Sequence, residues 1–122
     1  MTTAYWCVLV AVLLPYLFTG IAKSGKYNNR RPRDSLEALD GWRKRAHWAQ
    51  LNSFEAFAPF AAAVIIAQLA QAPQGTVDKL AIAFIVLRLI YGAFYLADIH
   101  VARTLTWTAA FGCVIALFVV AA

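Results

Sequence analysis

Four long apolar stretches constrain the fold of this chain more than any other feature. They cover about residues 3–22, 46–70, 80–97 and 104–122, and the first and last contain no Asp, Glu, Lys or Arg. A helix of roughly 20 apolar residues is long enough to cross the hydrocarbon core of a bilayer. Lipid cannot hydrogen-bond the backbone, so segments of this length must satisfy their polar groups as helices. The pattern predicts an all-α, integral membrane four-helix bundle, with one domain over residues 1–122.

The distribution of charge supports the same class of protein. Charged residues make up 14% of the chain, against roughly 25% in soluble domains. The net charge is +5, and eight of the eleven basic residues lie between Lys23 and Arg45. Nucleic-acid-binding proteins gather basic side chains with polar and aromatic partners on a folded face. A basic loop between apolar spans is instead a topology signal. We therefore expect the lipid bilayer, and no nucleic acid, as a partner.

The basic loop also predicts the orientation of the bundle. Cytoplasmic loops carry an excess of Lys and Arg, so loop 23–45 is expected in the cytoplasm. Both termini and the Gln71–Val77 turn then lie on the opposite side. Within the loop, Asp34 or Ser35 is a candidate cap for a short helix that ends near Leu39.

The histidines and cysteines do not suggest a metal site. Cys7 and Cys113 each lie within an apolar stretch, where a cysteine is usually a small buried hydrophobic residue. Neither has a second cysteine or a histidine at a metal-ligand spacing, so we expect no bound metal. His47 and His100 lie near the aqueous boundaries of their spans, and we expect both to be solvated.

Two charged residues within the apolar stretches require an explanation. A charge in a membrane span costs roughly 2.5–3.5 kcal/mol on insertion scales. At about 1.5 Å per residue, Glu55 lies roughly 13 Å and Arg88 roughly 15 Å from the loop side of the membrane. We therefore expect a structural ion pair between them, with Asn52 one turn away completing the hydrogen bonds. The pair either sets the register of the helices or belongs to a site, and the sequence leaves both interpretations open.

Polar side chains from three spans converge at this depth. One helical stripe of the third span carries Arg88, Tyr91, Tyr95 and Asp98. Arg103 and Thr104 open the fourth span from the same side. This arrangement favours a cationic pocket for an anionic ligand with polar and apolar parts. The alternative is that Arg103 and the loop contact only anionic lipid headgroups.

Two sequence segments resemble a known family. The segment RAHWAQLNSFEAFAPF, with Asn52-x-x-Glu55 and Pro59-Phe60, resembles the second helix of the MAPEG family, the membrane-associated proteins in eicosanoid and glutathione metabolism. The segment LRLIYGAFYLADIHVART resembles the third helix of that family and the start of its fourth. The resemblance implies a homotrimer of four-helix bundles that binds glutathione as a co-substrate between neighbouring subunits, near the cytoplasmic face. It also implies a bacterial-type member in an inner membrane.

The resemblance further implies roles for individual residues. Arg103 matches an arginine that holds the glutathione thiolate, and Arg88 matches a structural partner of the acid on the second helix. The residues that match glutathione contacts are Lys23, Asn52, Glu55, Tyr91, Tyr95 and Thr104. The eicosanoid enzymes have arginines where this chain has Trp48 and Leu51. The nearest cations here lie upstream, at Arg43, Lys44 and Arg45.

The implied function is that of a membrane-bound glutathione-dependent transferase or peroxidase. Its other substrate is expected to be a lipophilic small molecule, either an electrophile or a hydroperoxide. A thiol of pKa about 8.5 is mostly protonated at neutral pH, and a nearby guanidinium favours the thiolate. The alternative is a non-catalytic membrane module that binds a lipid or an anionic metabolite, or serves as a scaffold.

Overall fold

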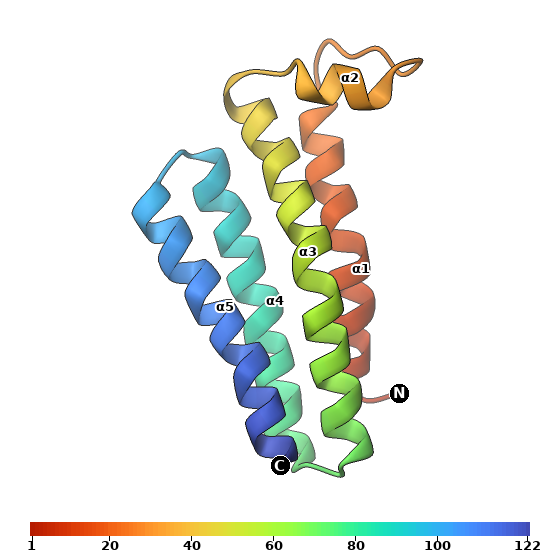
Figure 1. Cartoon of the computed structure of the whole chain (residues 1–122), viewed down its shortest axis with the longest axis vertical. Helices are drawn as coiled ribbons and strands as arrows, with labels where there is room; N and C mark the ends of the chain where they lie inside the picture. Colours follow the sequence, from red (N-terminus) through yellow and green to blue (C-terminus); the bar gives the residue numbers. More distant parts are fainter.

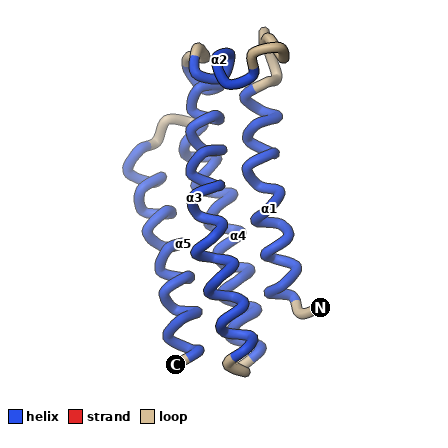
Figure 2. Tube along the Cα trace, turned by 45° about the vertical axis from the view of Figure 1, so that its right-hand side comes forward, coloured by secondary structure: helices blue, strands red, loops and turns tan.

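The computed structural model describes residues 1–122, and its only regular elements are helices (Figure 2). In chain order these are α1 Thr3–Ala22, α2 Pro32–Glu37, α3 Gly41–Leu69, α4 Gln74–Leu96 and α5 His100–Ala121. The four long helices run side by side, and α2 lies across one end of the bundle (Figure 1). We call this the loop end. Both termini lie at the opposite end, which we call the turn end (Figure 1).

The predicted all-α membrane fold is confirmed. Helices α1, α3, α4 and α5 are each long and apolar enough to cross a membrane. Large apolar side chains also remain exposed along the bundle, including Leu13 at 56%, Leu105 at 65% and Val119 at 67%. A soluble monomer rarely exposes contiguous apolar surface beyond a few hundred Å². This surface is suited to lipid or to a neighbouring apolar surface.

The helices extend beyond the apolar stretches at the loop end. Helix α3 begins at Gly41, whose φ of +60° suits a residue without a side chain. Arg43 and Arg45 are therefore helical residues instead of loop residues. Helix α5 begins at His100, which places Arg103 in its first turn. Lys and Arg are good helix formers, and their long side chains reach polar surroundings from a helix that leaves the apolar layer.

The short helix α2 forms, but it does not begin where the sequence indicated. Its N-cap is Arg31, no side chain caps it, and Pro32 occupies its first turn. The prediction that Asp34 or Ser35 caps this helix is wrong. Proline has a fixed φ and no N–H, so it already suits the first helical position. Ser35 Oγ instead donates to the carbonyl oxygen of Asn28 at 3.0 Å, which holds α2 against the preceding loop.

The core of the bundle combines aromatic stacking with close backbone approach. Phe60 of α3 stacks on Phe84 of α4 with ring centroids 4.0 Å apart. Phe18 of α1 is only 3% exposed and packs directly over Gly92 of α4, where there is no room for a Cβ. Small residues let helices approach closely in membranes, where helix packing depends on such contacts. The glycine thus fixes the spacing between α1 and α4 next to Tyr91.

A polar network holds the turn end together. The backbone N–H of Ala4, in the first turn of α1, donates to Asp78 Oδ1 of α4 at 2.9 Å. Gln74 Nε2 donates to the same oxygen at 2.7 Å and to Gln68 Oε1 of α3 at 2.9 Å. A carboxylate at a helix N-terminus satisfies a free N–H and complements the helix dipole. Asp78 therefore ties α1 to α4.

Candidate functional site

A groove on the loop-end half of the bundle collects four of the predicted site residues. It lies between α3 and α4 and has a volume of about 400 Å³. The predicted residues in its wall are Asn52 and Glu55 of α3 with Tyr91 and Tyr95 of α4. Spacings of three and four residues place each pair on one face of its helix. The volume falls within the roughly 300–1,000 Å³ that is typical of small-molecule sites.

Cations and aromatic rings alternate along this side of the bundle. The Cζ atom of Arg88 lies 4.3 Å from the centroid of the Tyr91 ring, which meets the Tyr95 ring edge-on at 5.6 Å. On the other side of Tyr95, the Cζ atom of Arg103 lies 4.4 Å from the ring centroid. A guanidinium over an aromatic face is attracted by about 0.5–2 kcal/mol, depending on its solvation. Tyr95, which lines the groove, thus links α4 to α5, and Arg103 contacts this ring without lining the groove itself.

The outer wall of the groove is aromatic where the eicosanoid enzymes have an arginine. Trp48 of α3 lines the groove, and its ring centroid is 6.4 Å from that of Tyr95. Lys44 Nζ lies 5.7 Å from the centroid of the Trp48 ring on the loop side. Leu51 completes this apolar part of the wall. A ligand in the groove would therefore meet two ring systems along one side.

The three consecutive cations at the start of α3 have a role that the sequence did not reveal. Arg43 Nε donates to the carbonyl oxygen of Ala22 at 2.9 Å, at the end of α1. Lys44 Nζ donates to the carbonyl oxygen of Glu37, at the end of α2. Arg45 donates through Nε and Nη2 to the carbonyl oxygen of Leu96, at 3.2 and 3.1 Å, at the end of α4. Each cation therefore caps the C-terminus of a different helix, where free carbonyls and the helix dipole favour positive charge.

These caps affect the interpretation of the basic residues near the groove. Successive helical residues point about 100° apart, so three in a row reach three different neighbours. Arg43 and Arg45 are committed to backbone carbonyls and do not line the groove. The feature of the sequence that could have indicated this capping role is the run of three cations at the start of a helix, on the side of the membrane where other helices end. We expected these residues only to lie upstream of the site.

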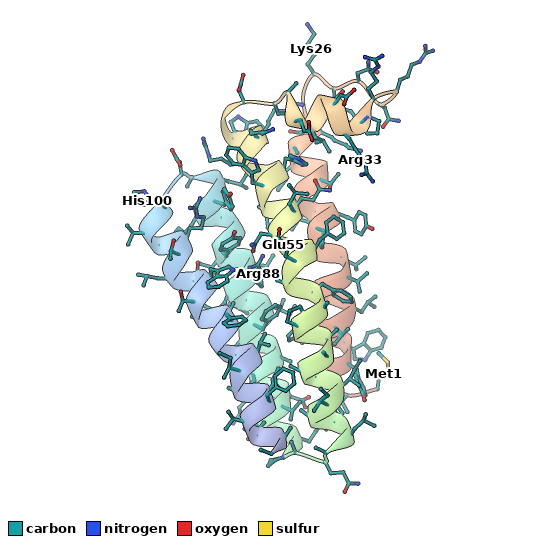
Figure 3. The ribbon with its side chains drawn as sticks, in the orientation of Figure 1. Met1, Lys26, Arg33, Glu55, Arg88 and His100 are labelled. Carbon is teal, nitrogen blue, oxygen red and sulfur yellow. The ribbon has the colours of Figure 1, made fainter.

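Glu55 and Arg88 lie at a similar height of the bundle, on α3 and α4 (Figure 3). Both line a cavity of about 130 Å³ between α3, α4 and α5. Arg88 is only 2% exposed, and its Nη2 has no hydrogen-bond partner. Glu55 Oε2 instead accepts a hydrogen bond from Asn52 Nδ2 at 3.4 Å. The predicted Glu55–Arg88 ion pair stays a prediction.

Lys23 and Thr104 do not line the groove. Lys23 follows the last residue of α1, and its Nζ lies 4.7 Å from the centroid of the Tyr27 ring in the same loop. Thr104 is exposed in the first turns of α5, and its carbonyl oxygen accepts from Thr108 Oγ1 at 2.8 Å. Within one chain these two residues are separate from the other four predicted contacts.

The two histidines differ. His100 is exposed at the start of α5, as expected. His47 is only 8% exposed, and its Nδ1 lies 3.1 Å from Gln50 Oε1, so the prediction that it is solvated is wrong. The reason is that α3 begins at Gly41, which places His47 well inside the packed part of that helix. Cys7 and Cys113 are free, and Cys7 is buried in the core.

The comparisons with known proteins bear on this arrangement of residues. A model of the MAPEG family matches residues 3–122, essentially the whole chain. Comparison with curated proteins and with solved structures found no match. The groove residues and the four membrane helices all lie within the matched range. The chain therefore belongs to the MAPEG family.

Proposed function

We propose that this protein is a membrane-bound, glutathione-dependent transferase or peroxidase that acts on lipophilic electrophiles or hydroperoxides. The observation that carries the proposal is the stacking of Arg103 on Tyr95, with the Arg103 Cζ atom 4.4 Å from the ring centroid. This contact places a cation from α5 against Tyr95, one of the residues that line a groove between α3 and α4. Membership of a family whose members generally use glutathione supports the choice of thiol.

Arg103 has the properties needed to activate a thiol. A guanidinium is a cation with several N–H donors, and it stabilises a neighbouring thiolate over the neutral thiol. The interaction strengthens when water is excluded, as at the boundary of a membrane. No general base is required, because the thiol loses its proton to solvent. The thiolate sulfur then bonds to the electrophilic carbon of the lipophilic substrate, and the leaving group departs with the bonding electrons.

The peroxidase reaction uses the same thiolate. Its sulfur attacks the terminal oxygen of a hydroperoxide, so that an S–O bond forms as the O–O bond breaks. The alkoxide that leaves takes a proton and becomes an alcohol. A second glutathione then reduces the sulfenic acid, and this step yields glutathione disulfide and water. Both reactions need the thiolate beside a path from the bilayer.

The groove offers contacts for the peptide part of glutathione. Glu55 is exposed toward it and suits the α-ammonium group of the γ-glutamyl residue. Asn52 also lines the groove, and the rings of Tyr91 and Tyr95 form one side. Because Arg43 and Arg45 cap helices, they do not supply the carboxylate contacts. We propose that Lys23 and Thr104 of a neighbouring subunit in a homotrimer complete the site.

The proposed orientation in a bacterial inner membrane places this site at the cytoplasmic side. Cytosolic glutathione would then reach the groove directly, and apolar substrates would arrive through the bilayer. Arg30 and Arg31 precede α2, which contains Arg33 and lies at the loop end of the bundle (Figure 1), and the groove residues belong to the parts of α3 and α4 toward that end. A reporter fused to either terminus should therefore report a location outside the cytoplasm.

Replacement of Arg103 tests the proposal. In detergent, Arg103→Ala should reduce turnover of a chlorodinitrobenzene or cumene hydroperoxide substrate by roughly 100-fold or more, because it removes the charge that stabilises the thiolate. Arg30→Ala, which changes an exposed loop arginine, is the matched control and should retain full turnover. Retention of turnover by Arg103→Ala would refute the role of this residue. A wild-type protein whose thermal stability does not respond to millimolar glutathione would instead support the non-catalytic module.

A further inference from the structure

The cavity between α3, α4 and α5 is distinct from the groove. Its polar end is formed by Asn52, Glu55 and Arg88, and the rest of its wall is apolar, with Phe84 and Trp107 among its members. The volume of about 130 Å³ is many times the roughly 10–15 Å³ that a single water molecule requires. Asn52 and Glu55 line both the cavity and the groove, so the two spaces share one wall.

Two residues that line this cavity each have a buried polar atom without a partner. One is Nη2 of Arg88, a donor, and the other is Oδ1 of Asn52, an acceptor. The orientation of the Asn52 amide follows from its other contact, because Nδ2 donates to the Glu55 carboxylate, which accepts only. Buried polar groups in native proteins nearly always have partners, and their absence therefore requires an explanation. A single group that satisfied both atoms would have to accept from the guanidinium and donate to the amide oxygen.

A hydroxyl or hydroperoxyl group meets both requirements. Its oxygen accepts one hydrogen bond and its O–H donates another. The charges in the cavity select against ionised ligands. The formal charges of Arg88 and Glu55, which both line the cavity, sum to zero, and an added carboxylate would bring a net negative charge into a mostly apolar site. The apolar remainder of the wall suits an alkyl or aryl group attached to the O–H.

We propose that this cavity binds the O–H-bearing end of an uncharged apolar molecule that enters from the bilayer. The proposal rests on the proposed function, which already includes hydroperoxides, and adds the site at which the O–H end of the second substrate, or of its alcohol product, binds. The shared wall of Asn52 and Glu55 sets the O–H group close to a thiol in the groove. Both substrates would then meet within one bundle.

Trp107 provides a reporter in the cavity wall. A variant in which Trp6, Trp42 and Trp48 are replaced by phenylalanine keeps Trp107 as the only tryptophan, because the chain has four. This variant, in detergent and without glutathione, is titrated with a long-chain alcohol brominated near its hydroxyl. The brominated alkane and the brominated fatty acid of the same length serve as matched ligands. Bromine quenches tryptophan emission only at short range, so saturable quenching reports occupation of the cavity.

We expect saturable quenching by the alcohol, with an apparent dissociation constant at least tenfold lower than that of the alkane or the fatty acid. Arg88→Met and Asn52→Leu, each in the single-tryptophan background, should each weaken binding of the alcohol at least tenfold. Arg30→Ala should leave the affinity for the alcohol unchanged. Equal quenching by all three ligands, or no effect of either cavity variant, would show that the cavity holds only water or lipid tails, and would overturn the proposal.

A second measurement uses the wild-type chain. A photoreactive diazirine alcohol should label α3, α4 or α5 at residues of the cavity wall, and excess unlabelled alcohol should compete for this labelling. Labelling spread evenly over the lipid-facing residues of the bundle would count against the site. Both measurements omit glutathione. A failure of the proposed function therefore appears as a missing response to glutathione, and a failure of this inference appears as a missing preference for the alcohol.

Discussion

The contact between Gly92 and Phe18 allows a prediction with a magnitude. A Cβ at position 92 would lie 2.1 Å from Cζ and 2.3 Å from Cε1 of the Phe18 ring. Carbon atoms pack at about 3.5–4.0 Å, so the ring would have to move by roughly 1.5 Å. Phe18 is 3% exposed and has little space to move into. The Gly92→Ala substitution therefore overpacks the interface between α1 and α4.

The expected cost follows from two opposing effects. Overpacking a buried position costs about 1–3 kcal/mol. Alanine in a helix interior is favoured over glycine by about 0.5–1 kcal/mol, which offsets part of that cost. Gly112 lies within α5, and a Cβ added there would meet no atom within 4 Å, so Gly112→Ala should show only the gain. The two variants should therefore differ by about 1–3 kcal/mol in their free energy of unfolding.

Thermal unfolding of the detergent-solubilised protein, followed by circular dichroism, measures this difference. At roughly 4 °C per kcal/mol for a domain of this size, Gly92→Ala should melt about 4–12 °C below Gly112→Ala. Adding Phe18→Leu to Gly92→Ala should recover part of the loss, because it removes the atoms that clash. The reasoning is refuted if Gly92→Ala melts with or above Gly112→Ala.

Three further predictions concern the contacts between helices. Arg45→Ala removes the cap on α4 and should lower the free energy of unfolding by about 1.5–3 kcal/mol, whereas exposed Arg30→Ala should leave the melting temperature unchanged. Asp78→Ala leaves the Ala4 N–H without its acceptor and should cost about 1–2 kcal/mol by the same measurement. Tyr95→Leu removes the ring under Arg103 and should raise the KM for glutathione severalfold; an unchanged KM and kcat would show that the ring does not position Arg103.

The sequence was sufficient to predict the fold because lipid leaves few alternatives. The chain has four apolar stretches, of which the first and the last contain no charged residue. These stretches predict four membrane helices, and the structure has them. The ends of the helices were harder to predict. Apolar composition marks where a helix lies in lipid, but α3 begins at Gly41 among polar residues. That shift turned His47 from an expected solvated residue into a buried one.

The sequence predicts those parts of the candidate site that depend only on the periodicity of residues along one helix. The spacing of Tyr91 and Tyr95 places both on one face, and the structure has both in the groove. Contacts between helices do not follow from spacing. The stacking of Arg103 on Tyr95 and the capping of α4 by Arg45 depend on how α3, α4 and α5 pack. The two unpartnered atoms of residues that line the cavity are likewise a property of packing alone.

Charged residues at the two ends of the bundle contact helix termini, whereas Arg88 in its middle has no such contact. Arg45 donates to a carbonyl oxygen at the C-terminus of α4, and Asp78 accepts from an N–H at the N-terminus of α1. Arg88 lies within α4, far from either terminus, and its Nη2 is unpartnered. A buried charge that is not fully satisfied lowers stability, so its presence is better explained by a ligand than by folding.

Stability and function should therefore respond in opposite directions when the two central charges are removed. The double substitution Glu55→Gln with Arg88→Met removes both charges and keeps side chains of similar length. Arg88 is buried, and replacement of a buried, incompletely satisfied charge by an apolar group of similar length is often neutral or stabilising, by up to about 4 kcal/mol. The double variant should therefore melt at or above the wild-type temperature in detergent, yet lose binding of the brominated alcohol. Arg88→Met alone leaves the Glu55 carboxylate without a nearby cation and should melt lower than the double variant. If the double variant melts well below the wild type, the two charges hold the bundle together, and Arg88 acts as the structural partner of Glu55.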